Sequence, residues 1–202
     1  MHHLDFSRST RVLWLLEEIG IEYKVVPHFR EPGFRAPASL RAVHDLGKAP
    51  VIEDDGLTIA ESAVILEYLD ARYAHGRFSP AAQIDRLRHA EALHFAENAL
   101  ASPLMTNLYG HLTGGLVGTF AAIVARDVEA ALGHVERMAT GRYFIGDELT
   151  LADIQLAYPL ELASYLGFLP EYPKAEAYLA RLYRRDALSR AIAVGGPMRS
   201  PL

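Results

Sequence analysis

Sequence patterns typical of β-strands occur only in the first part of this 202-residue chain, before Gly76. The short run MHHL predicts one strand, and EYKVV predicts a second strand that Pro27 ends. The segment PVIEDDGLTIA predicts a β-hairpin, because Asp55-Gly56 is a turn pair that favours tight hairpins. These segments together supply four strands.

Helical patterns alternate with these strands. Apolar residues recur at the spacing of one helix face before Gly20, in the run RVLWLLEEIG. APASLRAVHDLG predicts a short helix that Gly47 ends, and ESAVILEYLDARY predicts a third helix. The order β-α-β-α-β-β-α is too compact for a doubly wound nucleotide-binding domain. It predicts a four-strand α/β domain over residues 1–75, with helices packed against the sheet.

Only helical patterns follow Gly76, so residues 79–202 are expected to form an all-helical domain. Ser79-Pro80 has the cap hydroxyl and first-turn proline of a helix start. Pro103 is expected to kink or break the helical sequence that follows. Thr150 and Asp153 have the spacing of a capping box ahead of another apolar stripe.

Composition excludes several classes of function. The net charge of −5 argues against a nucleic-acid surface, and no apolar run is long enough to span a bilayer. The chain has no cysteine, which excludes disulfides, thiolate metal sites and redox chemistry on a protein sulfur. Its nine histidines lack metal-binding spacing, so no metal is expected. We expect a soluble, cytoplasmic protein.

Three motifs in order, SRSTRVLWLLEE, LGKAPVIEDDGLTIAESAVILEYL and FIGDELTLADIQLAYPL, resemble those of the cytosolic glutathione S-transferases. The similarity covers nearly the whole chain and is greatest to the serine-type, theta-like bacterial and fungal branches. It implies a thioredoxin-like first domain that binds glutathione as cosubstrate, a helical second domain that lines the electrophile site, and a homodimer.

The serines of the first motif suit thiolate chemistry. A free cysteine thiol has a pKa of about 8.5 and reacts as the thiolate, so an enzyme must favour the anion near neutral pH. A hydroxyl at the strand-to-helix turn can donate to the sulfur, and the helix N-terminus adds positive potential. Ser7 matches the family's S-x-x-x-R placement with Arg11, and Ser9 is the alternative. Both serines could instead be helix caps, and Arg11 is expected to support the fold.

The second motif supplies the expected glutathione contacts. In the resembled family the proline matching Pro50 is cis, and the backbone of the residue matching Ala49 pairs with the cysteinyl part of glutathione. Lys48 would lie near the glycine carboxylate. Glu61 would accept from the γ-glutamyl ammonium group, and Ser62 would bind the γ-glutamyl carboxylate at a helix N-terminus. Lys48 could instead be an ordinary surface lysine, and Glu61 and Ser62 could instead serve only to cap the helix.

The electrophile site leaves no motif, and apolar residues from both domains are its candidate lining: Phe6, Met105, Leu108 and Tyr109. The expected function is conjugation of glutathione to small hydrophobic electrophiles, as in detoxification. A glutathione-dependent isomerase or peroxidase is the second hypothesis, although the chain lacks the SSC turn of the isomerase branch. A non-catalytic interaction module of the same fold is the third.

Overall fold

A computed structural model describes residues 1–33 and 35–198 of the chain. Packing divides it into two units, one formed by Met1–Phe78 with the residues from Tyr183 onward, the other by Ser79–Leu182. The first expected domain ended at residue 75 and the second ran to residue 202. The packing units differ in that the last helix of the chain belongs with the first unit. Residues 199–202 lie outside the described part.

The first unit contains a four-stranded sheet in the order β2-β1-β3-β4. The strands are β1 (His2–Leu4), β2 (Val26–His28), β3 (Val51–Asp54) and β4 (Leu57–Ala60). β1 and β2 are parallel, while β3 is antiparallel to both β1 and β4. Asp55 and Gly56 have φ of 49° and 79°, the positive values that a tight hairpin turn requires. The predicted hairpin is confirmed.

Helices α1 (Ser9–Ile19), α2 (Ala38–Arg41) and α3 (Ser62–Tyr73) complete the predicted order β-α-β-α-β-β-α. The apolar residues of α1 from Val12 through Leu16, Trp14 included, are buried, and Ile19 is half-buried. Gly20 ends the helix in a left-handed conformation, as expected. With the helical second unit, this confirms the thioredoxin-like domain followed by an all-helical one.

Two local predictions in this unit were wrong. The second strand is Val26–His28 and contains Pro27, whereas EYKVV ending at Pro27 was expected. β2 is an edge strand, so one of its sides pairs with no other strand of the sheet. A proline, which lacks an N–H, is tolerated on that side because no hydrogen bond of the sheet is lost. The helix expected up to Gly47 is only the short α2, and turns follow it.

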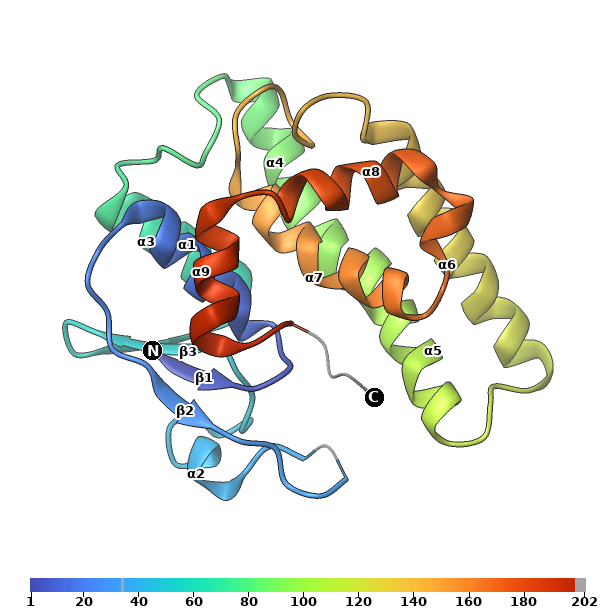
Figure 1. Cartoon of the computed structure of the whole chain (residues 1–202), viewed down its shortest axis with the longest axis horizontal. Helices are drawn as coiled ribbons and strands as arrows, with labels where there is room; N and C mark the ends of the chain where they lie inside the picture. The colour runs from blue at the N-terminus through green and yellow to red at the C-terminus, as the bar shows by residue number, and fades with distance from the viewer. Residues whose placement is uncertain (34, 199–202) are drawn as a thin grey trace. The chain divides into compact units, whose positions relative to one another are not determined.

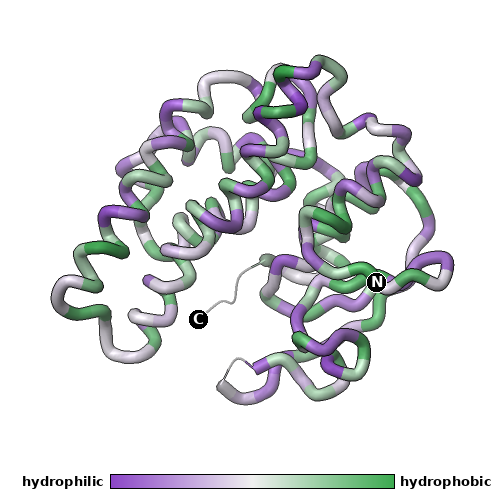
Figure 2. The backbone as a smooth tube through the Cα atoms, turned by 180° about the vertical axis from the view of Figure 1, so that it is seen from behind, coloured by the Kyte–Doolittle hydropathy of each residue, from purple (hydrophilic) through white to green (hydrophobic). Residues whose placement is uncertain are grey.

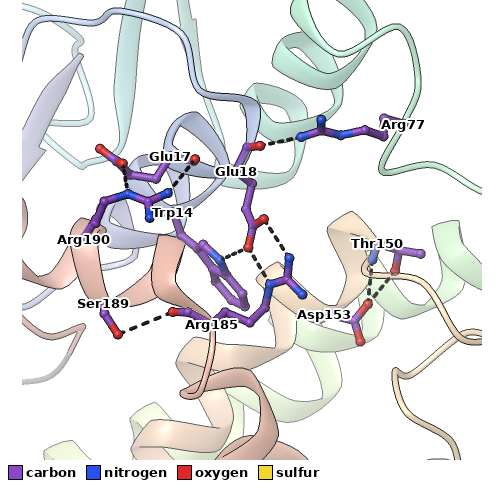
Figure 3. A network of polar contacts seen from close by, with 9 residues as sticks. All are labelled: Trp14, Glu17, Glu18, Arg77, Thr150, Asp153, Arg185, Ser189 and Arg190. Carbon is purple, nitrogen blue, oxygen red and sulfur yellow. Dashed lines mark hydrogen bonds and ion pairs between the residues drawn. The ribbon is translucent and has the colours of Figure 1, made fainter.

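The last helix, α9 (Asp186–Gly195), packs along α1, and Figure 1 shows these red and blue helices side by side. Two ion pairs join them (Figure 3). Arg185 binds the nearly buried carboxylate of Glu18 through Nε at 2.5 Å and Nη2 at 2.8 Å, and Arg190 Nε lies 2.7 Å from Glu17. The indole of Trp14 donates to the same Glu18 carboxylate at 2.9 Å. These contacts bind α9 and the residue before it to α1.

All the regular elements in the described part of the second unit are helices, and loops and turns connect them. Its elements are α4 (Gln83–Phe95), a π-helical turn η1 (Ala96–Ala101), α5 (Ser102–Leu112), α6 (Gly118–Met138), α7 (Leu151–Tyr165), a 3-10 turn η2 (Leu169–Glu171) and α8 (Pro173–Leu182). The start predicted at Ser79-Pro80 was wrong, because α4 begins at Gln83. Pro103 lies in the first turn of α5, where its missing N–H is tolerated, directly after the π-helical turn.

Helix α7 forms the core of the second unit. Every residue from Leu151 through Ala163 is buried, the polar Asp153, Gln155 and Glu161 included, so burial extends beyond the apolar stripe that the sequence predicted. By contrast α6 buries a single face, and its turns alternate between hydrophobic and hydrophilic colours in Figure 2. Within the described residues, no helix is long and apolar enough to cross a membrane.

Candidate functional site

The sheet register brings the three candidate segments to one edge of the first unit. His2 of β1 pairs with Val51 of β3 in an antiparallel sense, so Pro50 and Ala49 continue toward the C-terminal end of β1. Ala60, the last residue of β4, also pairs with Val51, and α3 begins just beyond it. The turn before α1, the segment before β3 and the start of α3 therefore share the edge where ligands of α/β sheets bind.

The β1–α1 turn is held by its two serines. Ser7 Oγ lies 2.7 Å from the Leu4 carbonyl oxygen and 2.6 Å from Ser9 Oγ. It also accepts the Ser9 amide at 3.1 Å, while Ser9 Oγ accepts the Leu4 amide at 3.1 Å. Both serines are buried, at 5% and 0% exposure. Ser7 Oγ thus accepts the amide of the first residue of α1, whereas Ser9 Oγ bonds the Leu4 backbone and does not cap the helix, whose N-cap residue is Arg8. The thiolate role remains a prediction.

Arg30 is a site residue that the sequence interpretation missed. Its guanidinium donates to the carbonyl oxygens of Asp5 at 3.1 Å and Phe6 at 3.0 Å, and its amide donates to the Asp5 carboxylate. These bonds hold both sides of Phe6, whose φ of 47° is unusual for a residue other than glycine. No local motif marks Arg30, because it lies after β2, far from this turn in the sequence.

The Ala49–Pro50 peptide bond is cis, as the family resemblance implied. Pro50 is buried, Ala49 is half-buried, and Lys48 is exposed. This segment enters β3 directly. It therefore presents a flexible cation and a stretch of backbone at the same edge as Ser7.

The start of α3 combines an exposed residue with a buried one. Glu61 is exposed with φ of 68°, and Ser62 is 5% exposed. Arg11 is fully buried in α1 and donates from Nη1 to Ser62 Oγ at 3.2 Å. The guanidinium thus joins the first turns of α1 and α3, in agreement with the expected structural role of Arg11.

The candidate electrophile residues lie in both units. Phe6 is half-buried in the β1–α1 turn. Met105, Leu108 and Tyr109 follow one face of α5, where Tyr158 donates to the Met105 sulfur at 3.4 Å and Tyr109 is exposed. Among residues 1–33 and 35–198, no group of three or more His, Asp or Glu is placed to hold a metal ion.

The two parts of the chain match two family models. Residues 6–72 match the glutathione S-transferase N-terminal domain, and residues 82–181 match the glutathione S-transferase C-terminal domain. The matched ranges together cover the candidate site and most of the helical unit.

Individual relatives agree with these matches. Glutathione S-transferase 1 of Saccharomyces cerevisiae is 32% identical, with 93% of this chain and 91% of the relative aligned. Glutathione S-transferase 3 of Schizosaccharomyces pombe is 31% identical, over 86% of this chain and 77% of the relative. The crystal structure of a glutathione S-transferase from Actinobacillus pleuropneumoniae superposes with a TM-score of 0.86 at 32% identity, covering 96% and 91% of the two chains. The chain belongs to the glutathione S-transferase family.

Proposed function

We propose that this chain conjugates the thiolate of glutathione to small hydrophobic electrophiles, with Ser7 as the thiolate-stabilising residue and Ser9 as the alternative. As a family member, the chain is a glutathione transferase that uses glutathione as cosubstrate. The convergence of the serine turn, the cis-proline segment and the start of α3 at one sheet edge carries the assignment of the site.

In this mechanism the chain lowers the pKa of the bound thiol. The Ser7 hydroxyl donates to the sulfur, and the amide groups at the start of α1 add positive potential. The thiol releases its proton to water, and a sulfur lone pair of the thiolate forms a C–S bond with the electrophile. A leaving group departs with its bonding electrons, or an activated alkene takes a proton from water after the addition. Stabilising the thiolate raises the fraction of bound glutathione that is ionised. The groups that bind the rest of the peptide stay unchanged.

The remaining residues would bind the peptide. The exposed Lys48 faces the glycine carboxylate as a point charge, and the Ala49 backbone pairs with the cysteinyl residue ahead of the cis Pro50. Glu61 accepts from the γ-glutamyl ammonium group, while Ser62 binds the neighbouring carboxylate. Arg11 supports this last contact by fixing the Ser62 hydroxyl.

The candidate lining for the electrophile stays Phe6 in the first unit and Met105, Leu108 and Tyr109 of α5 in the second, because small hydrophobic substrates need apolar contacts. We further propose that the protein works as a homodimer in the cytoplasm, without a metal. Sedimentation of the purified chain tests the dimer directly.

The first test is calorimetric titration of glutathione into the native chain and into Ser7→Ala, beside an assay with a chloronitroarene. We expect Ser7→Ala to keep glutathione binding within about threefold and to lose conjugation by about 10²-fold, typical of removing one preorganised donor. Loss of binding together with activity would instead mean that the serine shapes the turn. Isomerisation or peroxide reduction without conjugation would favour the second enzyme hypothesis.

Failure of the native chain to bind glutathione at millimolar concentration would remove the catalytic assignment. The interaction-module hypothesis would then stand. Ser189→Ala, an exposed substitution in α9, is the matched control for loss of a serine hydroxyl.

A further inference from the structure

Two serine hydroxyls share one carbonyl acceptor in the β1–α1 turn. The Leu4 carbonyl oxygen lies 2.7 Å from Ser7 Oγ and 3.0 Å from Ser9 Oγ. The two hydroxyl oxygens are themselves 2.6 Å apart, so one of them donates to the other. All three groups are buried.

The two serine hydroxyl protons can be arranged in two ways within the turn. Each serine has one hydroxyl proton, so the pair can donate two hydrogen bonds. One of these bonds goes to the Leu4 carbonyl oxygen, and the other joins the two serine oxygens. In one arrangement Ser7 donates to Leu4 and Ser9 donates to Ser7. In the other, Ser9 donates to Leu4 and Ser7 donates to Ser9. Both protons stay inside the turn in either arrangement, so neither is directed at a ligand.

We propose that Ser9 is a positioning residue that releases the Ser7 proton for the glutathione thiolate by taking over the Leu4 carbonyl. This inference rests on the proposed function of Ser7. When Ser9 donates to Leu4, the Ser7 proton can turn from Ser9 to the sulfur by rotation about one bond. A neutral hydrogen bond is thereby exchanged for a charge-assisted one, which is the stronger kind.

The backbone keeps Ser7 in place during this exchange. Ser7 Oγ still accepts the Ser9 amide at 3.1 Å, and Ser9 Oγ still accepts the Leu4 amide at 3.1 Å. Without the Ser9 hydroxyl, Ser7 is the only serine left to donate to Leu4. Turning its proton to the sulfur then takes that donor from a buried carbonyl, which is unfavourable. Ser9 therefore acts on the sulfur through Ser7.

The test compares the native chain with Ser9→Ala, Ser9→Thr, Ser7→Ala and the double variant Ser7→Ala/Ser9→Ala. Glutathione affinity is measured by calorimetry, and the pKa of the bound thiol by its ultraviolet thiolate absorbance. The rate constant kcat with a chloronitroarene is measured at pH 6.5 and pH 9. The ratio of the two kcat values does not depend on how much of a variant is folded when the folded fraction is the same at both pH values, which circular dichroism at pH 6.5 and pH 9 checks. A destabilised Ser9→Ala then still gives an answer.

We expect Ser9→Ala to raise the pKa of the bound thiol by about one unit, which lowers kcat at pH 6.5 about tenfold and lowers it much less at pH 9. Ser9→Thr keeps a hydroxyl and should restore the native pH profile. Adding Ser9→Ala to Ser7→Ala should change the profile no further, because a residue that acts only through another shows complete coupling.

Three results would overturn the inference while leaving the proposed function intact: an unchanged pH profile in Ser9→Ala, additive effects in the double variant, or a larger loss in Ser9→Ala than in Ser7→Ala. The last would make Ser9 the direct donor. A native chain that binds no glutathione would overturn the proposed function, and this inference with it.

Discussion

Two residues at the candidate site have backbone conformations that L-amino acids rarely adopt. Phe6 and Glu61 have φ of 47° and 68°, and each lies directly before a serine of the proposed site. A conformation of this kind costs on the order of 1–3 kcal/mol and persists only where surrounding structure imposes it. At Phe6, the Arg30 guanidinium helps to impose this conformation, because it donates hydrogen bonds to the carbonyl oxygens of Asp5 and Phe6. The positive φ of each residue sets the direction in which the backbone enters the serine that follows.

Glu61→Gly separates strain from binding. Glycine adopts a positive φ without steric cost, so the free energy of unfolding should stay unchanged or rise by up to about 1 kcal/mol. The affinity for glutathione should fall at least about tenfold, because the carboxylate that accepts from the ammonium group is lost. Urea unfolding and calorimetry measure the two effects. Glu61→Gln keeps the backbone strain and should weaken binding alone; equal affinity in all three proteins would contradict the assignment.

At the scale of elements, one carboxylate organises the start of α7. Asp153 accepts the amide and hydroxyl of Thr150 at 2.8 and 2.9 Å, which confirms the predicted capping box. It also accepts the Phe144 amide at 2.8 Å and the Tyr178 hydroxyl of α8 at 2.6 Å. Asp153 thus joins α7, α8 and the preceding loop, a role beyond capping that the motif spacing did not reveal.

Removing these two residues should cost unequal amounts of stability. Thr150→Ala should lower the free energy of unfolding by about 1 kcal/mol, the usual cost of a lost helix cap. Asp153→Ala should cost about 3 kcal/mol or more, because it leaves several buried donors without an acceptor. Urea denaturation followed by circular dichroism compares them, with Tyr178→Phe removing a single donor as the control. Equal losses for Thr150→Ala and Asp153→Ala would show that Asp153 acts only as a cap.

At the scale of the whole chain, its last helix is bound to its first strand and helix. His3 Nε2 donates to the Gly195 carbonyl at 2.7 Å, and the Thr10 hydroxyl donates to Gly196 at 3.3 Å. A Cβ on Gly195 would come 2.4 Å from Leu13 and 2.6 Å from His3, so only glycine permits this approach. Burial lowers the pKa of His3, outweighing the opposing bond to Gly195.

This lowered pKa predicts a pH dependence of stability. Unfolded His3 binds a proton below about pH 6.5, whereas the folded form stays neutral to lower pH. The unfolded state then binds more protons, so stability is complete above about pH 6.5 and decreases as the pH falls toward the folded pKa. His28, whose pKa burial also lowers, adds to the effect. Urea unfolding between pH 8 and pH 5 should show this decrease.

His3→Gln should reduce the slope of stability against pH, because its amide can still donate but does not titrate in this range. His94→Gln, at an exposed position of α4, controls for the change of side chain. A native stability that is flat from pH 8 to pH 5 would contradict the prediction, as would an unchanged slope in His3→Gln.

Local sequence was sufficient where short-range chemistry decides the structure. Asp55-Gly56 specified the hairpin turn, Gly20 the end of α1, and Thr150 with Asp153 the start of α7, because each depends on residues within one or two turns. Where neighbours in space decide, local sequence failed. Pro27, predicted to end a strand, lies within β2, and the helix predicted to start at Ser79-Pro80 begins at Gln83.

The sequence by itself determined the order of strands and helices, and its motifs marked Ser7, Pro50 and Ser62 as candidates. Tertiary structure alone decided that α9 packs on α1, that Arg30 holds the turn before Ser7, and that Ser7 and Ser9 share the Leu4 carbonyl. The physical reason is the distance along the chain over which each interaction acts. Capping, turns and periodicity act between near neighbours in the chain, whereas these contacts depend on side-chain positions that the register of the sheet and the packing of distant helices create.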